Sequence, residues 1–208
     1  TGVAVPLRLP TAFCAPNFAY LMASDAVDAL RRVGGIGEVR VQLDDHHDSD
    51  KINAGLAADA GYRGTFGGET EESLDELRLT FQRKAHTAAM ERCIEEQLKS
   101  TGLAVSDIYR LRLRNLLGGQ KKEALLRRRV AIGLGIGGDE PVFVDEHGVA
   151  VPPDDIPLRL RFAKSVRMSI EGNQHFCRGM LATRYEDEDE GDLAARITNT
   201  RLTHRSVS

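Results

Sequence analysis

Two short segments with the alternating pattern of β-strands flank a segment with helical spacing near the start of the chain. Apolar and polar residues alternate loosely over residues 3–9 and more regularly over residues 39–43. Pro6 and Pro10 indicate that the first segment is an edge strand or ends early. Between the two segments, apolar residues recur at helical spacing up to Gly34. These residues are Phe18, Leu21, Met22, Ala26, Ala29, Leu30 and Val33. The order predicts a β-α-β unit, with a right-handed crossover if the strands are parallel neighbours.

Most of the chain beyond residue 48 has helical patterning that is interrupted by glycines and prolines. Two apolar runs, residues 142–144 and 149–151, predict a small hairpin. Residues 61–68 and 152–157 are rich in turn-forming residues and predict loops. The predicted helices cover residues 50–59, about 73–98, 121–134 and 169–185.

The pattern as a whole predicts an α/β (α+β) fold, in which a small β-α-β core precedes a mostly helical C-terminal extension. We expect a core over residues 1–60, a helical extension with a small hairpin over 61–185, and an acidic, flexible tail over 186–208. The long helix has two apolar stripes, which indicates packing between two layers or between two copies in a homodimer. Thr1 is not an initiator Met, which leaves open an N-terminal truncation of the core.

Composition narrows the class of protein further. The 208 residues carry a net charge of −3, which argues against nucleic-acid binding by the whole chain. A basic stretch over residues 110–129 fits a solvated face, or a docking surface for an acidic partner, better than a nucleic-acid surface. No apolar run is long enough to cross a bilayer, so no membrane partner is expected. The three cysteines are widely spaced, which predicts reduced thiols and a cytoplasmic protein.

Cys14 is the strongest candidate in the sequence for a chemically reactive residue. It lies between the end of the first predicted strand and the start of the first predicted helix, which Asn17 is expected to cap after Pro16. Unpaired N–H groups at a helix start stabilise a thiolate, the form that binds metals and attacks electrophiles. The alternative is a small buried residue at a tight corner, because free cysteines are often buried.

The first fifth of the chain resembles the PaaD and SufT type of iron–sulfur cluster assembly proteins. The resemblance covers about residues 3–45 and rests on the strand, Thr11, the Cys14 corner with Pro16, the apolar helix and the Val-x-Val strand. It implies a small α/β domain whose reactive cysteine helps to mature iron–sulfur proteins. On this basis Cys14 is the functional position, with Thr11 as a companion in binding the cluster. Ala15 stands between cysteine and proline where the family has them adjacent, and the family's Asp-Pro-Glu motif before the first strand is absent here.

Two further groups of side chains could bind a metal. The turn at residues 44–48 contains His46 and His47 among carboxylates, a combination that suits transition metals, although the same residues could simply cap a helix. In the last predicted helix, Glu171 and His175 are four residues apart and share a face. Their alternative role is a surface hydrogen bond.

The remaining cysteines differ in what they could do. Cys177 could form a thiolate pair with Cys14 if the C-terminal helix folds back onto that corner. His86 and Cys93 lie on one side of the long helix, about 10 Å apart along its axis at 1.5 Å per residue. This separation is too large for one metal, so we expect both to pack in the core.

These observations favour an accessory factor over a metabolic enzyme. In this interpretation Cys14 binds iron or an iron–sulfur cluster transiently and delivers it to a client metalloprotein, alone or with other assembly factors. The alternative is a non-catalytic scaffold or stoichiometric subunit of a larger complex. A thiol enzyme with Cys14 as nucleophile is a third hypothesis, which lacks a local histidine signature.

Overall fold

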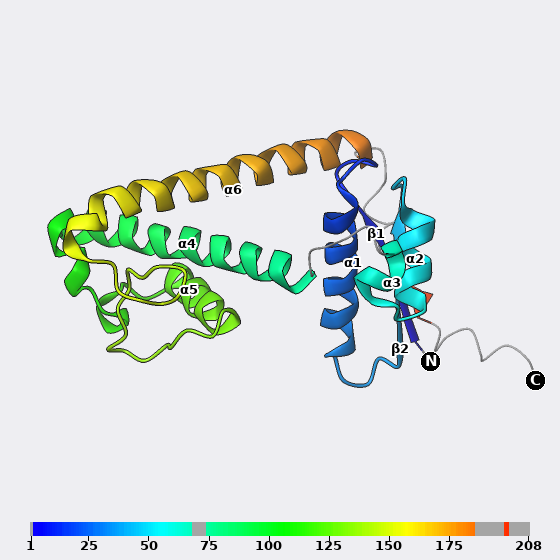
Figure 1. Cartoon of the computed structure of the whole chain (residues 1–208), viewed down its shortest axis with the longest axis horizontal. Coiled ribbons are helices and arrows are strands. Elements are labelled where there is room, and N and C mark those ends of the chain that lie inside the picture. The colour runs from blue at the N-terminus through cyan, green and yellow to red at the C-terminus, as the bar shows by residue number, and fades with distance from the viewer. Residues whose placement is uncertain (1, 68–73, 186–197, 200–208) are drawn as a thin grey trace, which may run out of the picture. The chain divides into compact units, whose positions relative to one another are not determined.

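The computed structural model describes residues 2–67, 74–185 and 198–199. The chain divides into two compact units, each described separately below. Unit 1 contains residues 1–74 and 175–208, and unit 2 contains residues 75–174. The fold is α+β with a long helical region, as predicted (Figure 1).

Unit 1 is built on a parallel pair of strands. β1 (Gly2–Arg8) and β2 (Glu38–Asp44) pair in register, so that Gly2 lies opposite Glu38 and Arg8 opposite Asp44. The helix α1 (Pro16–Arg31) connects them, which confirms the predicted β-α-β unit. A short β3 (Thr198–Asn199) pairs antiparallel with the other edge of β1, giving the order β2-β1-β3. The rest of the predicted tail lies outside the described residues.

The helices of unit 1 cover one face of this sheet. Val41 and Leu43 of β2 are buried whereas Arg40 and Gln42 are exposed, the alternation expected of a strand with one covered face. The core of this unit consists of Leu9, Ala19, Tyr20, Ala23, Leu43 and Ile52.

Two local predictions in unit 1 were wrong. Asn17 does not cap α1: the helix begins at Pro16, with Ala15 as the N-cap residue. Proline suits this first position because its missing N–H would have no partner there. Residues 61–66, predicted as a loop, form the helix α3 (Gly61–Phe66), which follows α2 (Ser49–Ala57).

Aromatic packing explains the formation of α3. The rings of Tyr62 and Phe66 lie 5.4 and 6.0 Å from that of Tyr20 in α1. Burial of these rings stabilises the short helix despite its two glycines. Gly55 of α2 allows close approach, since a Cβ there would overlap Thr65 of α3.

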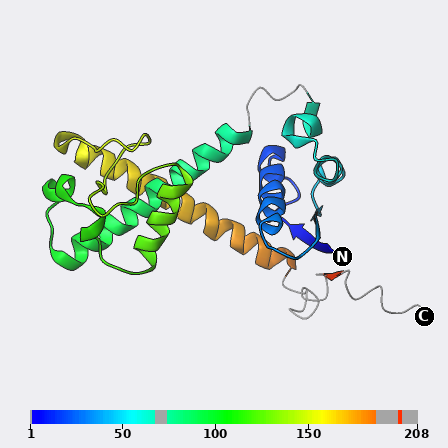
Figure 2. The same ribbon diagram turned by 90° about the horizontal axis from the view of Figure 1, so that it is seen from below.

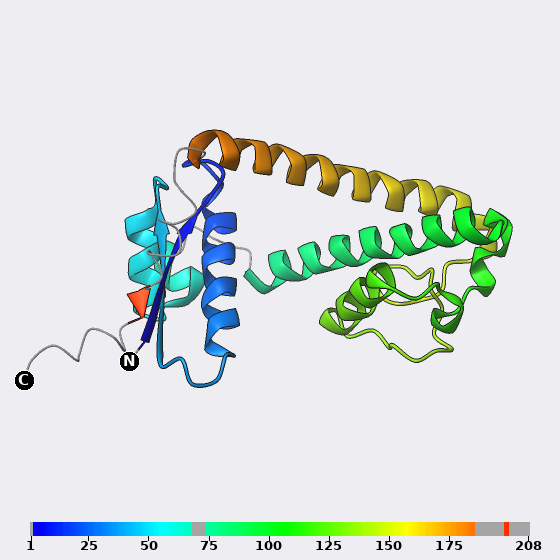
Figure 3. The same cartoon turned by 180° about the vertical axis from the view of Figure 1, so that it is seen from behind.

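Unit 2 contains the long helices of the extension (Figures 2 and 3). Its core is a cluster of mostly aliphatic residues, with Phe143 and Cys93, from α4, α5, the connecting segments and the start of α6. The predicted hairpin forms only in part, because Val144 and Ala150 make a single isolated β-bridge. The elements are α4 (Leu74–Thr101), the 3-10 turns η2 (Val105–Arg110) and η3 (Leu113–Asn115), α5 (Gln120–Ala131), η4 (Pro153–Asp155) and the part of α6 (Ile156–Tyr185) up to residue 174.

The helix α6 begins thirteen residues before the predicted start at residue 169. Pro157, the last residue of the predicted loop, lies in the first turn of α6, where proline is tolerated. Arg167 of α6 forms an ion pair with the buried Glu91 of α4. This pairing offsets the cost of burying the Glu91 carboxylate.

Part of the predicted basic stretch is internal to unit 2. Arg129 is almost completely buried, and its guanidinium donates to the carbonyl oxygens of Gly135 at 2.7 Å and Pro141 at 3.1 Å. Lys121 pairs with Glu96 at 2.7 Å. These contacts leave less free positive charge than the sequence suggests.

His86 and Cys93 are both buried in unit 2, as expected for core residues. His86 is 2% exposed, and its Nε2 atom has no hydrogen-bond partner among the described residues. Burial, and to a smaller extent the charge of Arg129, lowers the pKa of His86 from 6.5 to about 4. The imidazole is therefore neutral in the folded protein at neutral pH.

We predict that His86 makes the protein sensitive to mild acid. The unfolded chain binds a proton at His86 near pH 6.5 and the folded chain only near pH 4, so stability is lost as the pH falls through this window. The full effect is about 3 kcal/mol. Urea unfolding followed by circular dichroism should show a larger loss in the wild type than in His86→Leu. Equal pH dependence in the two proteins would contradict the prediction.

Candidate functional site

The candidate site lies at the carboxyl ends of the two parallel strands. The corner at residues 9–15 follows β1, and the turn at residues 45–48 follows β2. The strands pair in register, so the corner and the turn leave the sheet at the same end. The sequence left open whether these two segments would meet.

The Cys14 corner is fixed by short-range hydrogen bonds. The Thr11 hydroxyl oxygen accepts a hydrogen bond from the Phe13 N–H at 3.1 Å, so this side chain shapes the turn. Cys14 is half-buried, has a free thiol, and packs at the edge of the unit 1 core. Phe13 is 80% exposed. An unusually exposed aromatic ring therefore lies directly beside the cysteine.

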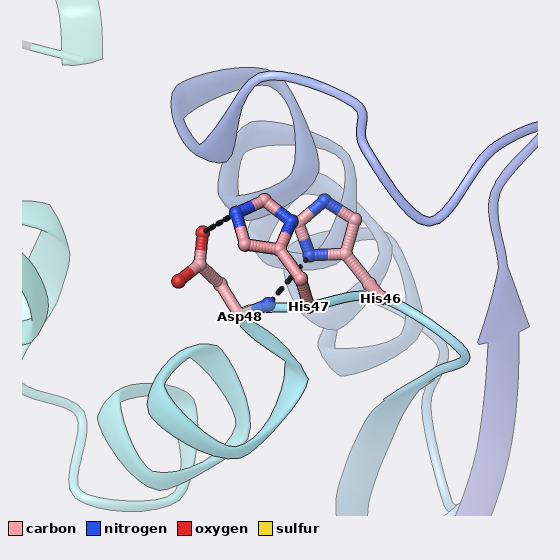
Figure 4. A group of neighbouring side chains, drawn as sticks. All are labelled: His46, His47 and Asp48. Carbon is pink, nitrogen blue, oxygen red and sulfur yellow. Dashed lines mark hydrogen bonds and ion pairs between the residues drawn. The ribbon is translucent and has the colours of Figure 1, made fainter.

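His46 joins the turn to the cysteine corner, and Figure 4 shows its ring beside His47 and Asp48 of the same turn. This side chain is only 5% exposed, and its Nε2–H donates to the Cys14 carbonyl oxygen at 2.9 Å. Its Nδ1 accepts a hydrogen bond from the Asp48 N–H at 3.1 Å. A neutral imidazole has one donor and one acceptor, so both capacities of this ring are used. In this arrangement His46 positions the backbone of Cys14.

His47 lies beside His46 and adds a second link between the segments. Its backbone N–H donates to the Ala12 carbonyl oxygen at 3.1 Å, and its ring Nδ1 lies 3.0 Å from the same oxygen. Its Nε2 lies 2.9 Å from a carboxylate oxygen of Asp48. The ring also stacks on Phe13 with centroids 5.9 Å apart. The side chain of His47 is about half exposed, unlike that of His46.

The turn brings together three groups that could bind a metal. One potential ligand atom from each of His46, His47 and Asp48 lies within 4.8 Å of the others, and no other such group occurs in the described part of the chain. His46 could bind an ion only by losing a hydrogen bond to the backbone. His47 Nε2 and the Asp48 carboxylate could bind one by giving up only their mutual contact. These two residues are therefore the better ligands, and an imidazole with a carboxylate suits a transition metal.

The candidates in the C-terminal helix are not gathered into this group. Glu171 forms ion pairs with Arg92 and Arg167, each at 3.0 Å, within unit 2. Cys177 and His175 are exposed on α6, in the portion that belongs to unit 1. Among the described residues, none of the three predicted positions joins a set of three metal-ligating side chains. Their roles in metal binding stay predictions.

No sequence pattern predicted a contact between the end of α6 and the candidate site. Arg184 donates to the Leu9 carbonyl oxygen at 3.2 Å and pairs with the Asp45 carboxylate. The Tyr185 hydroxyl donates to Asp45 at 3.0 Å. Burial and this hydrogen bond raise the pKa of Tyr185. Asp45 and Tyr185 lie far apart in the sequence, and no motif connects them.

Comparison with known proteins adds no family to these observations. No family model, curated protein or solved structure matches the chain. Among the described helices, none has the length and apolar character needed to span a membrane. The interpretation of the site therefore rests on its own chemistry.

We predict that His46 contributes much more to stability than its neighbour His47. His46→Ala leaves the Cys14 carbonyl and the Asp48 N–H without their partner and opens a cavity, at a cost of about 2–4 kcal/mol. The matched change His47→Ala removes a half-exposed ring and should cost about 1 kcal/mol or less. Urea unfolding of both variants at neutral pH checks this order. Equal losses would contradict the positioning role of His46.

We also predict three distinct rates of thiol alkylation. Cys177 is exposed and should react first, followed by the half-buried Cys14. Cys93 should react only on unfolding, because burial raises the pKa of its thiol to about 11. Iodoacetamide treatment at mildly alkaline pH, followed by peptide mass spectrometry, gives the three rates. Early modification of Cys93 would show that unit 2 opens readily.

Proposed function

We propose that this protein is an accessory factor for iron–sulfur cluster or metallocentre assembly, in which Cys14 carries the cargo. The observation that supports this most directly is the position of Cys14. Its half-buried, free thiol lies on a corner whose backbone is held by His46 at the shared carboxyl end of two strands. The resemblance of residues 3–45 to the PaaD and SufT type of assembly proteins points to the same residue.

The proposed chemistry is an exchange of ligands. The Cys14 thiol gives its proton to solvent, and its thiolate replaces a water ligand on iron, or on an iron atom of a cluster, which is the cargo of the protein. The thiolate of a client cysteine then bonds to the same iron, and the Cys14–iron bond breaks. No electrons are transferred in this sequence. Iron–sulfur clusters are held in proteins by sets of cysteines, so a cargo bound by one cysteine can leave for a client that supplies more.

His47 and Asp48 can assist this exchange from the neighbouring turn. The Asp48 carboxylate is held 2.9 Å from His47 Nε2, and together they supply a nitrogen and an oxygen ligand. Thiolate, imidazole and carboxylate are all ligands of iron in proteins. We propose that these two side chains bind the cargo weakly while it passes through Cys14. Cys177, His175 and Glu171 are not needed in this scheme.

The proposed partners are a client metalloprotein and other assembly factors. Phe13 is exposed next to Cys14 and offers an apolar contact to a client. Three free cysteines fit a reducing compartment, so we propose a cytoplasmic location. Neither a membrane nor a nucleic acid is needed for this function.

A non-catalytic scaffold is the second candidate function. Leu158 and Phe162 are exposed large apolar residues four positions apart on α6, the spacing of a helix face that binds a partner. His46 and Thr11 also shape the cysteine corner without any need for a metal. In this role Cys14 would have no chemical function.

Anaerobic reconstitution separates the two candidates. We expect the wild type to bind iron when supplied with ferrous iron and sulfide, and to transfer it to an apo-ferredoxin as reporter. Cys14→Ser should lose at least tenfold in the transfer rate, about 1.4 kcal/mol in the transition state. Cys177→Ser is the matched control, because it removes an exposed thiol, and it should transfer normally.

Iron content, visible absorption and reporter activity are the measurements. Equal transfer by wild type and Cys14→Ser, with both folded by circular dichroism, would reject the assembly function. A partner that copurifies in a fixed ratio with both proteins would then support the scaffold.

A further inference from the structure

The strand β2 is an edge strand whose outer side is only partly covered. Its inner side pairs with β1 along its whole length. At its carboxyl end, the Asn53 side chain of α2 accepts from the Leu43 N–H at 2.8 Å and donates to the Leu43 carbonyl at 3.0 Å. The amide of Asn53 thus takes the place of a neighbouring strand at this single residue.

The amino half of β2 has no such cover. Backbone groups in a strand alternate in direction, so Val39 and Val41 present their N–H and C=O groups to the same side as Leu43. Among the residues that the structure describes, no group hydrogen-bonds to the outward backbone of Val39 or Val41. Unpaired edges of this kind are templates for pairing with another strand.

A groove of about 710 Å³ runs along this uncovered edge within unit 1. Its floor is the strand itself, residues 37–42, and its walls come from α1 and α2, which flank the strand in Figure 1. The walls contribute Val27, Leu56 and Ala57 as apolar contacts. The groove therefore combines free backbone hydrogen-bonding groups with an apolar lining, which suits an added strand.

We propose that the occupant of this groove is the β2 strand of a second copy of the chain, paired antiparallel about Val39. In this register Val39 of one copy lies opposite Val39 of the other, and the two residues exchange both backbone hydrogen bonds. Glu38 of each copy then lies opposite Arg40 of the other. Two copies joined in this way form one continuous sheet across a two-fold axis.

Charge complementarity selects both the partner and the register. The segment Glu38-Val39-Arg40 consists of an acidic, an apolar and a basic residue. When two copies of it pair antiparallel, each acidic residue therefore lies opposite a basic residue of the other copy. Within one copy the Arg40 guanidinium lies 3.5 Å from the Glu38 carboxylate, and the Glu38 and Arg40 side chains are 77% and 70% exposed. An exposed ion pair of this kind is weak, so pairing of the strands exchanges it for two contacts between the copies. Directly opposite, non-hydrogen-bonded pairs bring side chains closest together, which favours opposite charges there. If one strand is shifted by two residues, the same backbone groups still face the partner, but Arg40 then lies opposite Arg40 and the two like charges repel each other.

The arrangement also fits the cover provided by α2. Asn53 blocks the edge at Leu43, so pairing is confined to residues 37–41, where the groove is open. The overlap is short, and we therefore expect a reversible dimer. This inference does not depend on the proposed role of Cys14.

Charge exchange tests the proposal on the full chain. Sedimentation velocity over a range of concentrations should show a monomer–dimer equilibrium for the wild type. Arg40→Glu alone and Glu38→Arg alone place like charges opposite each other, and each should weaken dimerisation about tenfold. The double variant Glu38→Arg/Arg40→Glu restores opposite charges and should dimerise like the wild type. Mixing the two single variants should give a heterodimer.

Val39→Pro is a second variant that tests the backbone contacts. It removes an N–H that points away from β1, so the pairing within unit 1 should survive while the dimer is lost. Circular dichroism checks the fold of every variant. A wild type that stays monomeric at all concentrations would overturn the proposal. A dimer that tolerates both single charge changes and Val39→Pro would also overturn it, because its interface would lie elsewhere.

Discussion

The in-register parallel pairing of β1 and β2 is the constraint on which the candidate site depends. Parallel strands that start and end together release their following segments at the same end of the sheet. Only for this reason can His46 reach the Cys14 carbonyl, although 32 residues separate them. A shift of the register by one residue would also reverse the side of β2 that faces the core. Register, burial and site geometry are therefore set together.

Regular patterns made the first half of unit 1 predictable. The apolar spacing of α1 and the alternation in β2 each predict one element and its buried face. Both patterns involve only residues that are close together in the sequence. Other features depended on contacts that no local pattern reports. The helix α3 forms because its two aromatic rings pack on Tyr20, and the first residue of α6, Ile156, is buried in the core of unit 2. The β3 pairing joins residues at opposite ends of the chain.

Residue types in the sequence were enough to select the candidate residues of this site, but not to distinguish their individual roles. Sequence patterns singled out Cys14, His46 and His47. In the structure the two histidines form a compact group with Asp48, and the His46 ring hydrogen-bonds to the Cys14 carbonyl oxygen. Sequence patterns could not distinguish the two histidines, which have the same ligating chemistry. Their hydrogen bonds distinguish them: His46 uses both ring nitrogens on the backbone, and His47 keeps one nitrogen beside a carboxylate. Such differences in hydrogen bonding arise only from the fold.

The contacts of Arg184 and Tyr185 with the end of the sheet make unit 1 a discontinuous domain. Its two parts are separated in the chain by the whole of unit 2, residues 75–174. During synthesis, a ribosome adds about 5–20 residues per second, so unit 2 emerges seconds before the last part of its host. Until residues 175–185 have been synthesised, the end of the sheet in unit 1 lacks its contacts with Arg184 and Tyr185. Unit 2 therefore has time to fold before unit 1 is complete.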